Sequence, residues 1–239
     1  MKILDLTLPS PQENLACDEG LLELCEQGYE HEIVRFWEPG EPFVVLGYSS
    51  RISSDVKLGA CRRFRVPILR RCSGGGTVLQ GRGCLNVSLI LRLDGESSLR
   101  TITGTTRFIL RRHKEALEPL IGRSIDVAGL SDLAIGGRKF SGNAQRRKRR
   151  GVLFHGTFLL DFDLPLVERL LAEPPRQPAY RRHRPHREFL LNLGIAAQPV
   201  KDALAAAWKA DERLETAPLP QIERLTKAVY SSDAWTLRC

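Results

Sequence analysis

The chain of 239 residues carries 36 lysines and arginines against 28 aspartates and glutamates, a formal net charge of +8. It has no apolar run of membrane-spanning length and no leader-like N-terminus, which predicts a cytoplasmic protein without membrane span, secretion signal or mitochondrial targeting. The positive charge favours acidic partners, which are nucleic acid, phosphorylated small molecules or an acidic protein.

Hydrophobic periodicity and turn residues divide the chain into alternating helices and strands. These elements follow each other through short connections, which predicts an α+β fold with a mixed, largely antiparallel sheet and flanking helices. Helices are expected at 16–28, 105–122, from 164 onward and at 201–214. Strands are expected at 31–39 and 41–48 around a Pro-Gly turn, at 66–71, 84–93 and 151–163, and on both sides of the Gly-Gly turn in 132–145.

The cysteines form no C-x-x-C pair, which argues against a structural zinc site. A chain of this length without a leader is not expected to depend on disulfides. We therefore expect free, mostly buried thiols at Cys17, Cys25, Cys61, Cys72, Cys84 and Cys239.

Two basic stretches leave alternatives open. Residues 173–188 (EPPRQPAYRRHRPHRE) are either a mobile loop, the usual case for this composition, or an ordered binding segment. Residues 146–150 (RRKRR) are typical of a solvated loop, but they could attract an acidic protein or nucleic acid. Few aromatic residues stand among them, so base stacking is not supported.

The stretch RRCSGGGTV, residues 70–78, carries the strongest chemical signal. Consecutive glycines after a strand permit positive φ angles and remove every Cβ, so a ligand can lie against the backbone N–H groups. Phosphate oxygens are the usual ligands of such loops. Arg71 adds a guanidinium group and Ser73 adds a hydroxyl. The pattern is neither a P-loop nor G-x-G-x-x-G, and a tight turn that merely needs glycines would look the same.

Two further stretches carry candidate groups. Lys139 lies between a Gly-Gly turn and the small residues Ser-Gly-Asn, where it could reach a phosphate or carbonyl oxygen on which negative charge develops. An ordinary exposed hairpin lysine is the competing interpretation. His155 precedes Gly156 and a threonine, and it is either catalytic or hydrogen-bonded inside the fold.

Together these stretches resemble the lipoate–protein ligase family, within the biotin and lipoate A/B protein ligase superfamily, in a short single-domain form. The resemblance is carried, in matching order and spacing, by NLACDEGLL, RFWEPGEPFVVLGYSS, RRCSGGGTV and SDLAIGGRKFSGNAQRRKRRGVLFHGTFLLDFDL. It implies a fold similar to class II aminoacyl-tRNA synthetases and biotin ligase. It also implies one catalytic domain over 1–239, with a helical tail from about 195 in place of a full accessory domain.

The resemblance implies a reaction in two steps. Lipoate or octanoate reacts with Mg-ATP to give an acyl-adenylate and pyrophosphate, and the acyl group then passes to a lysine of a lipoyl-carrier protein. That carrier is a glycine-cleavage H protein, a 2-oxoacid dehydrogenase lipoyl domain or a lipoate-binding protein. A separate small accessory protein could replace the missing domain, and neither nucleic acid nor membrane is implied as a partner.

The resemblance also implies roles for individual residues. Lys139 would be the catalytic group that bridges the acyl carbonyl and the phosphate, and no metal ligand from a protein side chain is assigned. The ATP and acyl-adenylate site would comprise Lys139 with Arg71, Ser73, Gly74, Gly75, Gly76, Thr77, Val78 and Leu79. Further substrate contacts would come from Asp132, Ser141, Gly142, His155 and Gly156.

Related octanoyltransferases use no ATP and carry the acyl group on a cysteine. One kind has this cysteine shortly before the His-Gly pair, where this chain has Val152, and the other has it in the loop that here reads DVAGLS, 126–131. Neither position is a cysteine, which favours the ATP-dependent reaction, with Cys72 and Cys84 as the stand-in nucleophiles to test.

Two other points bear on the prediction. Many ligases carry a histidine-aspartate pair after the glycines, where this chain has Gln80 and Gly81. A non-catalytic basic binding protein of the same fold is the remaining alternative, against which the retained Arg71, Gly74, Gly75, Gly76 and Lys139 argue.

Overall fold

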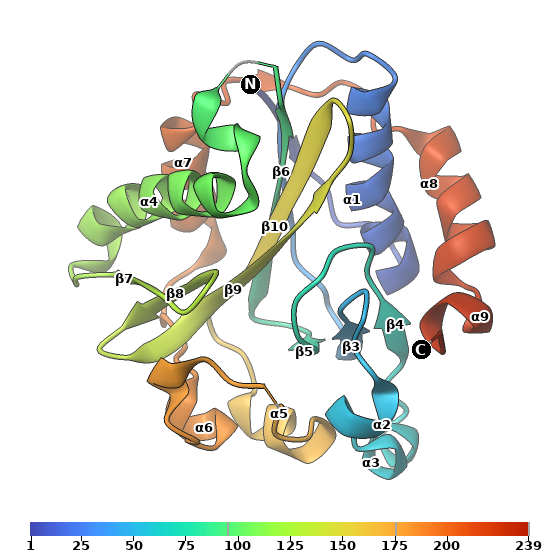
Figure 1. The fold of residues 1–239 in the computed structure, drawn as a ribbon, viewed down its shortest axis with the longest axis vertical. Coiled ribbons are helices and arrows are strands. Elements are labelled where there is room, and N and C mark those ends of the chain that lie inside the picture. The colour runs from blue at the N-terminus through green and yellow to red at the C-terminus, as the bar shows by residue number, and fades with distance from the viewer. Residues whose placement is uncertain (95, 175, 239) are drawn as a thin grey trace.

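The structure of this chain is a computed structural model that describes residues 1–94, 96–174 and 176–238. Its centre is an eight-stranded sheet in the order β11-β1-β2-β6-β10-β9-β8-β7 (Figure 1). β1 runs parallel to β2 and β11, and the other pairs of this sheet are antiparallel, so the predicted mixed, largely antiparallel sheet is confirmed. The strands are β1 (Lys2–Asp5), β2 (Ile33–Trp37), β6 (Cys84–Arg92), β7 (Asp126–Ala128), β8 (Asp132–Ile135), β9 (Arg138–Arg147), β10 (Gly151–Leu159) and β11 (Glu212–Arg213).

A second, three-stranded sheet consists of β3 (Phe43–Leu46), β4 (Ile68–Arg70) and β5 (Val78–Gln80), in the order β4-β3-β5. The strands expected on either side of the Pro-Gly turn both form, but β2 and β3 belong to different sheets and do not pair. Pro39 and Pro42 between them cannot donate ladder hydrogen bonds, which prevents a continuous hairpin. The glycine loop, residues 71–77, joins β4 to β5.

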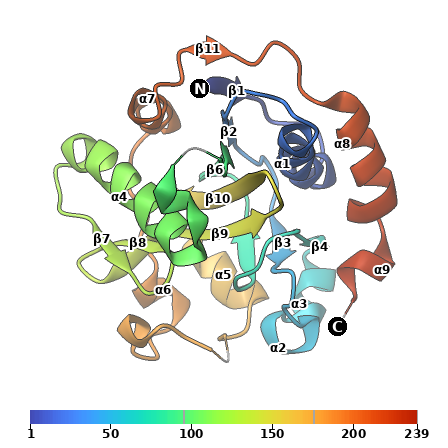
Figure 2. The same ribbon diagram turned by 45° about the horizontal axis from the view of Figure 1, so that its top comes forward.

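Helices cover both faces of the large sheet, which explains why β6 is buried along almost its whole length. α1 (Pro11–Glu26) packs with β3 and β4 on one face, and α4 (Ile102–Ile121) packs with α7 (Ala197–Ala207) on the other (Figure 2). The remaining helices are α2 (Ile52–Asp55), α3 (Leu58–Arg63), α5 (Leu164–Leu170), α6 (His186–Phe189), α8 (Leu219–Leu225) and α9 (Asp233–Thr236), with shorter turns at Ser97–Arg100, Ala179–Arg181 and Thr226–Tyr230.

The expected helices have clear end signals. Ser10 and Glu13 form a capping box at the start of α1, and Thr101 caps α4, which ends at Gly122 with φ of 67°. The helix expected at 201–214 is wrong in its second half. The chain reverses at Lys209, which has a positive φ of 50°, and Glu212 then pairs with Lys2 in the sheet.

The five cysteines that the structure describes, Cys17, Cys25, Cys61, Cys72 and Cys84, are free and buried, as predicted. Cys239 lies outside the described residues. None of the described helices is long and apolar enough to cross a membrane.

The buried His113 on α4 should make the free energy of unfolding depend on pH. Its imidazole is enclosed, Nε2 accepts a hydrogen bond from Trp208 Nε1 at 3.0 Å, and burial lowers its pKa to about 3. Below about pH 6.5 the unfolded chain takes up a proton on this histidine and the folded chain does not. His113 should therefore lower the free energy of unfolding by about 1.4 kcal/mol for each pH unit as the pH falls. In urea unfolding, the free energy of unfolding of His113→Leu should fall less steeply with decreasing pH than that of wild type. The exposed control His31→Asn should fall as steeply as wild type. Parallel slopes in wild type and His113→Leu would contradict the assignment.

Candidate active site

A cavity of about 320 Å³ lies between the large sheet, the glycine loop and the chain after α5. Its floor is the face of the large sheet that α1 and the small sheet cover, and its side wall is built by β8, β9 and described residues between 171 and 190. Of the basic segment 173–188, Pro174, Arg176, Pro178, Arg181 and His186 line this wall, so these residues form part of the cavity.

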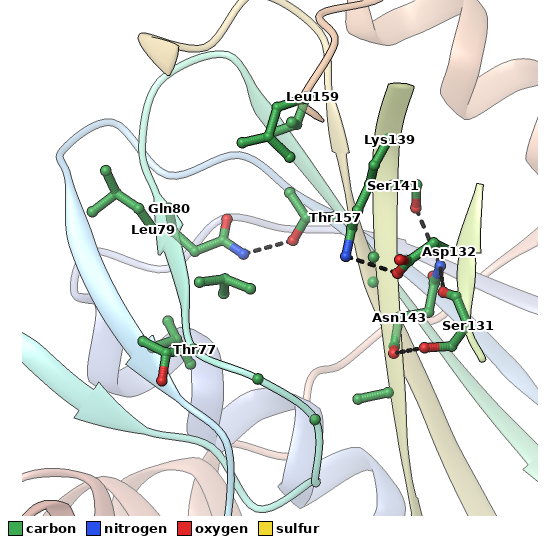
Figure 3. Close-up of a pocket in the computed structure, with 18 of the residues that line it drawn as sticks. Thr77, Leu79, Gln80, Ser131, Asp132, Lys139, Ser141, Asn143, Thr157 and Leu159 are labelled. Atoms are coloured by element: carbon green, nitrogen blue, oxygen red, sulfur yellow. Dashed lines mark hydrogen bonds and ion pairs between the residues drawn. The ribbon is translucent and has the colours of Figure 1, made fainter. Parts of the chain in front are cut away.

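Most of the predicted site residues meet in this cavity (Figure 3). Ser73 and Gly74 are not among its lining residues, and the Ser73 side chain is fully buried. The predicted residues that line the cavity are Arg71, Gly75, Gly76, Thr77, Val78, Leu79, Asp132, Lys139, Ser141, Gly142, His155 and Gly156.

Lys139 is held by a carboxylate at the mouth of the β8–β9 hairpin. Gly136 and Gly137, with φ of 56° and 71°, form the tight turn that sets β8 beside β9. Lys139 Nζ lies 2.7 Å from Asp132 Oδ1, and the other oxygen of Asp132 accepts a hydrogen bond from Tyr180 Oη at 2.7 Å. The lysine is thus a positioned cation, and its side chain keeps 25% exposure towards the cavity.

Two glycines of the predicted motifs make room for side chains. A Cβ on Gly142 would lie 2.6 Å from Lys139 Nζ, and one on Gly156 would lie 1.8 Å from Asn143 Oδ1. Each contact is far shorter than packed atoms allow, so any larger residue must displace its neighbour. The Lys-x-Ser-Gly pattern therefore sets the place of the lysine itself.

The glycine loop is shaped from inside by Arg71. Its Nη2 donates to the carbonyls of Gly74 at 2.6 Å and Gly76 at 2.9 Å, and its Nε donates to Ser73 Oγ at 3.1 Å. Burial lowers the pKa of this guanidinium to about 10, which leaves it charged at neutral pH. Since the C=O and N–H of a trans peptide point in opposite directions, the N–H groups of Gly75 and Thr77 point away from Arg71 and are available to an anion.

A hydrogen-bond chain connects this loop to α1. His155 Nδ1 lies 3.1 Å from Asp18 Oδ2, and its Nε2 lies 2.5 Å from Ser73 Oγ. The Asp18 carboxylate accepts from Nδ1, and Ser73 Oγ, which lies beside Nε2, also accepts from Arg71 Nε. The arrangement resembles a serine nucleophile triad, but the buried Ser73 hydroxyl offers no face to a substrate.

Asp18 is itself fixed by a buried ion pair. Arg35 Nη1 lies 2.6 Å from Asp18 Oδ1, and both side chains are almost wholly enclosed. Burial opposes ionisation of Asp18, but the Arg35 charge and the hydrogen bond from His155 outweigh it and hold its pKa below the usual value.

Sequence reasoning missed Asp18, Asn86 and Tyr180, and it noted Gln80 without giving it a role. Gln80 Nε2 donates to Thr157 Oγ1 at 2.6 Å, Thr157 donates to Asn86 Oδ1 at 2.6 Å, and Asn86 Nδ2 donates to Gln80 Oε1 at 3.1 Å. This closed triangle lines the cavity wall, and it includes Gln80 from the sequence position of the expected histidine-aspartate pair. The polar residues Asn86 and Ser88 within an apolar strand were the available signal for this wall, since buried polar side chains need partners.

The cavity contains no thiol from the described residues. Cys72 and Cys84 do not line it, and burial raises the pKa of each thiol to about 12. Val152 points into the core below α4. A reactive cysteine needs an accessible thiolate, which neither Cys72 nor Cys84 offers to this cavity. Among residues 1–94, 96–174 and 176–238, no three His, Cys, Asp or Glu side chains are grouped to hold a metal ion.

The family model of the lipoyl protein ligase A/B catalytic domain matches residues 10–206. This chain belongs to that family. An octanoyltransferase LipM of Symbiobacterium thermophilum is 30% identical, over 96% of this chain and 95% of its own length. A protein of Aeropyrum pernix assigned as a lipoate-protein ligase A is 34% identical, over 71% of this chain and 61% of its own length. The family thus contains relatives of both chemistries.

The fold agrees with this membership. The structure of a bi-partite lipoate protein ligase from Thermoplasma acidophilum superposes with a TM-score of 0.83 at 23% identity, over 99% of this chain and 95% of that one. The mixed sheet with flanking helices is therefore the lipoate ligase fold, as the sequence predicted. The chain is an enzyme of the lipoate ligase and octanoyltransferase family.

Gly142→Ala should remove most of the activity without unfolding the protein. The new methyl group would occupy the position of Lys139 Nζ and displace the ammonium by an ångström or more, and such a misplacement can cost about 100-fold in rate. The measurement is the rate of carrier acylation beside thermal unfolding. Gly59→Ala is the matched control, because nothing lies within 4 Å of a Cβ there. Full activity in Gly142→Ala would contradict the role given to this glycine.

Proposed function

We propose that this protein is an ATP-dependent lipoate–protein ligase, which joins lipoate or octanoate to a lysine of a lipoyl-carrier domain through an acyl-adenylate. The observation that supports this best is the composition of the cavity. A positioned lysine and a loop with outward N–H groups meet in a site whose described residues include no cysteine. Such a site suits phosphoryl chemistry and lacks the nucleophile of a thioester mechanism.

In the first step the acid carboxylate attacks the α-phosphorus of ATP, and negative charge builds on the phosphoryl oxygens. The amides of Gly75 and Thr77 are preset to stabilise this charge, and Lys139 lines the same cavity. On substrate binding Lys139 transfers from Asp132 to the α-phosphate and acyl oxygens, while Tyr180 keeps the carboxylate in place. Arg71 acts by holding the loop, and direct contact of Arg71 with a phosphate stays a prediction.

In the second step the carrier lysine attacks the acyl carbonyl of the mixed anhydride and AMP leaves. The intermediate is already activated, so the protein needs only to position it and to stabilise the oxyanion, which Lys139 does. The apolar side chains of Leu15, Trp37, Val45 and Val78 line the end of the cavity near α1 and provide the pocket for the acyl chain. Mg²⁺ would arrive with the nucleotide phosphates.

The second candidate is an ATP-independent octanoyltransferase, which is favoured by the LipM relative that covers nearly the whole chain. The loop that holds the cysteine in one kind of transferase corresponds here to residues 126–131, which form β7 and the turn before β8 and contain no cysteine. A transferase mechanism would therefore need a different acyl carrier on the protein. This is why we place the ligase reaction first.

The carrier is proposed to be a small acidic lipoyl domain. The Thermoplasma ligase with the same fold was solved together with the E2 lipoyl domain of its own system. The net charge of +8 of this chain suits an acidic partner, because opposite charges speed the encounter of two proteins.

The ligase reaction predicts release of pyrophosphate that depends on ATP and on lipoate or octanoate. Lys139→Ala should lower this release by at least about 100-fold, as expected for the loss of a positioned charge at a transition state. Cys72→Ala and Cys84→Ala should keep it, because neither thiol lines the cavity. No release by wild type, together with acyl transfer from an octanoyl carrier protein, would replace the ligase with the transferase.

Carrier recognition should depend on salt. The KM for an acidic lipoyl domain should rise several-fold between 50 and 300 mM NaCl, because ions screen charges on exposed surfaces. The KM for lipoate should change little over the same range, because its chain enters an apolar end of the cavity. Measured affinity for oligonucleotides that equals affinity for the carrier would point to the basic binding protein instead.

A further inference from the structure

The closed triangle of Gln80, Asn86 and Thr157 is an uncharged polar element inside the cavity. Gln80 comes from β5 of the small sheet, and the other two come from β6 and β10 of the large one, so the triangle joins the two sheets. Gln80 and Asn86 are each 5% exposed, and all three residues line the cavity. Burying amide groups costs free energy that apolar side chains would not, so a wall that only closed the cavity would not need them.

The register of the sheet places the triangle next to the ammonium of Lys139. Thr157 pairs directly with Gly142 on β9, and Lys139 Nζ lies 2.6 Å from the position that a Cβ on Gly142 would take. Directly opposite residues share one face of a sheet, with their Cβ positions about 5 Å apart. Figure 3 shows Thr157 between the Gln80 amide and Lys139. The ammonium, which lies over Gly142, is therefore one strand spacing from the triangle.

One row of opposite residues crosses the sheet from the charged pair to the apolar end of the cavity. In order across β8, β9, β10, β6 and β2, the row comprises Asp132, Gly142, Thr157, Asn86 and Trp37. Asp132 holds Lys139 at one end, and Trp37 at the other belongs to the apolar pocket proposed for the acyl chain. An acid with its chain at Trp37 and its carboxyl group at Lys139 therefore brings that carboxyl group to the triangle.

The triangle keeps N–H donors in reserve. Gln80 Nε2 donates to Thr157 Oγ1 at 2.6 Å, and Asn86 Nδ2 donates to Gln80 Oε1 at 3.1 Å. A primary amide carries two N–H groups, and among the described residues each of these nitrogens makes one hydrogen bond. Gln80 Nε2 is the donor beside Lys139, because it bonds to the threonine that opposes Gly142. An oxygen that accepts at about 2.9 Å from two nitrogens needs them roughly 5 Å apart, which is the spacing of opposite residues in the sheet.

We propose that Gln80 donates its second amide N–H to the acyl oxygen of the bound acid and, with Lys139, stabilises negative charge on that oxygen. This proposal rests on the proposed ligase function. In adenylation the bond holds the carboxylate oxygen that does not attack, and an uncharged donor does so without a second positive charge that would weaken the nucleophile. In transfer the carrier amine bonds to the acyl carbon, and the carbonyl electron pair moves to the oxygen between Gln80 and Lys139. This pair then re-forms the carbonyl, the bond to AMP breaks, AMP keeps the bonding electrons, and the amine releases its proton to water.

The two half-reactions test this assignment. Gln80→Met, which keeps the length of the side chain and removes both donors, should slow lipoate-dependent ATP–pyrophosphate exchange about tenfold or more. It should slow transfer from supplied lipoyl-adenylate to a lipoyl domain to a similar degree, because both steps share the acyl oxygen. The KM for ATP should stay within about twofold of wild type, and Gln80→His, which returns one N–H donor, should restore part of both rates. Gln145→Met is the matched control and should leave both rates unchanged, because this amide also makes two hydrogen bonds but does not line the cavity.

Distinct outcomes overturn the proposal. Unchanged rates in Gln80→Met would show that Gln80 does not bind the acyl oxygen. Loss in one half-reaction alone, or a raised KM for ATP with normal transfer, would contradict a contact that both steps share. If Gln80→Met does not fold, Thr157→Val, which keeps the shape of its side chain and removes the hydroxyl that orients Gln80, carries the same test. Absence of exchange in wild type would instead refute the ligase function on which the proposal rests.

Discussion

The site depends on the hydrogen bonds that the buried Arg71 side chain donates to the carbonyls of the glycine loop. A buried guanidinium must find acceptors, and here two of them are carbonyls of the glycine loop. The same hydrogen bonds that satisfy the arginine orient the loop amides outward. Ser73, His155, Asp18 and Arg35 continue this network into the sheet and α1, so the geometry of the loop is secured by buried charges that cannot be left unpaired.

Glycine serves two different purposes in the site. In the loop, Gly75 has φ of 85° and lies close to Arg71, so its backbone conformation and its missing side chain both matter. At Gly142 and Gly156 the backbone is ordinary strand, and the missing Cβ makes space for Lys139 and Asn143 on neighbouring positions. A glycine-rich motif can therefore indicate that space is needed for a catalytic side chain as well as for a ligand.

Family membership and chemistry are separate conclusions for this chain. One fold supports both an adenylating ligase and a thioester transferase, and the difference lies in whether an accessible thiolate reaches the cavity. The buried, protonated Cys72 and Cys84 do not supply one. Their burial under the small sheet is ordinary core packing, as expected for free cysteine.

Local sequence was sufficient for β2, β3, β4, β6, β8, β9 and β10, for the Gly-Gly turn before Lys139 and for the glycine loop, because periodicity and φ preferences act over a few neighbouring residues. The short strands β1, β5, β7 and β11 were not predicted, because two to four residues carry too little periodicity. The family pattern named Lys139, Asp132 and His155, and the structure brings these three residues to one cavity. The partners of these residues could not be read in this way. Asp18 on α1 and Tyr180 after α5 reach the site only through the register of the sheet and the path of the chain across it. Contacts between residues so far apart leave no local pattern, because they are set by the packing of the whole molecule.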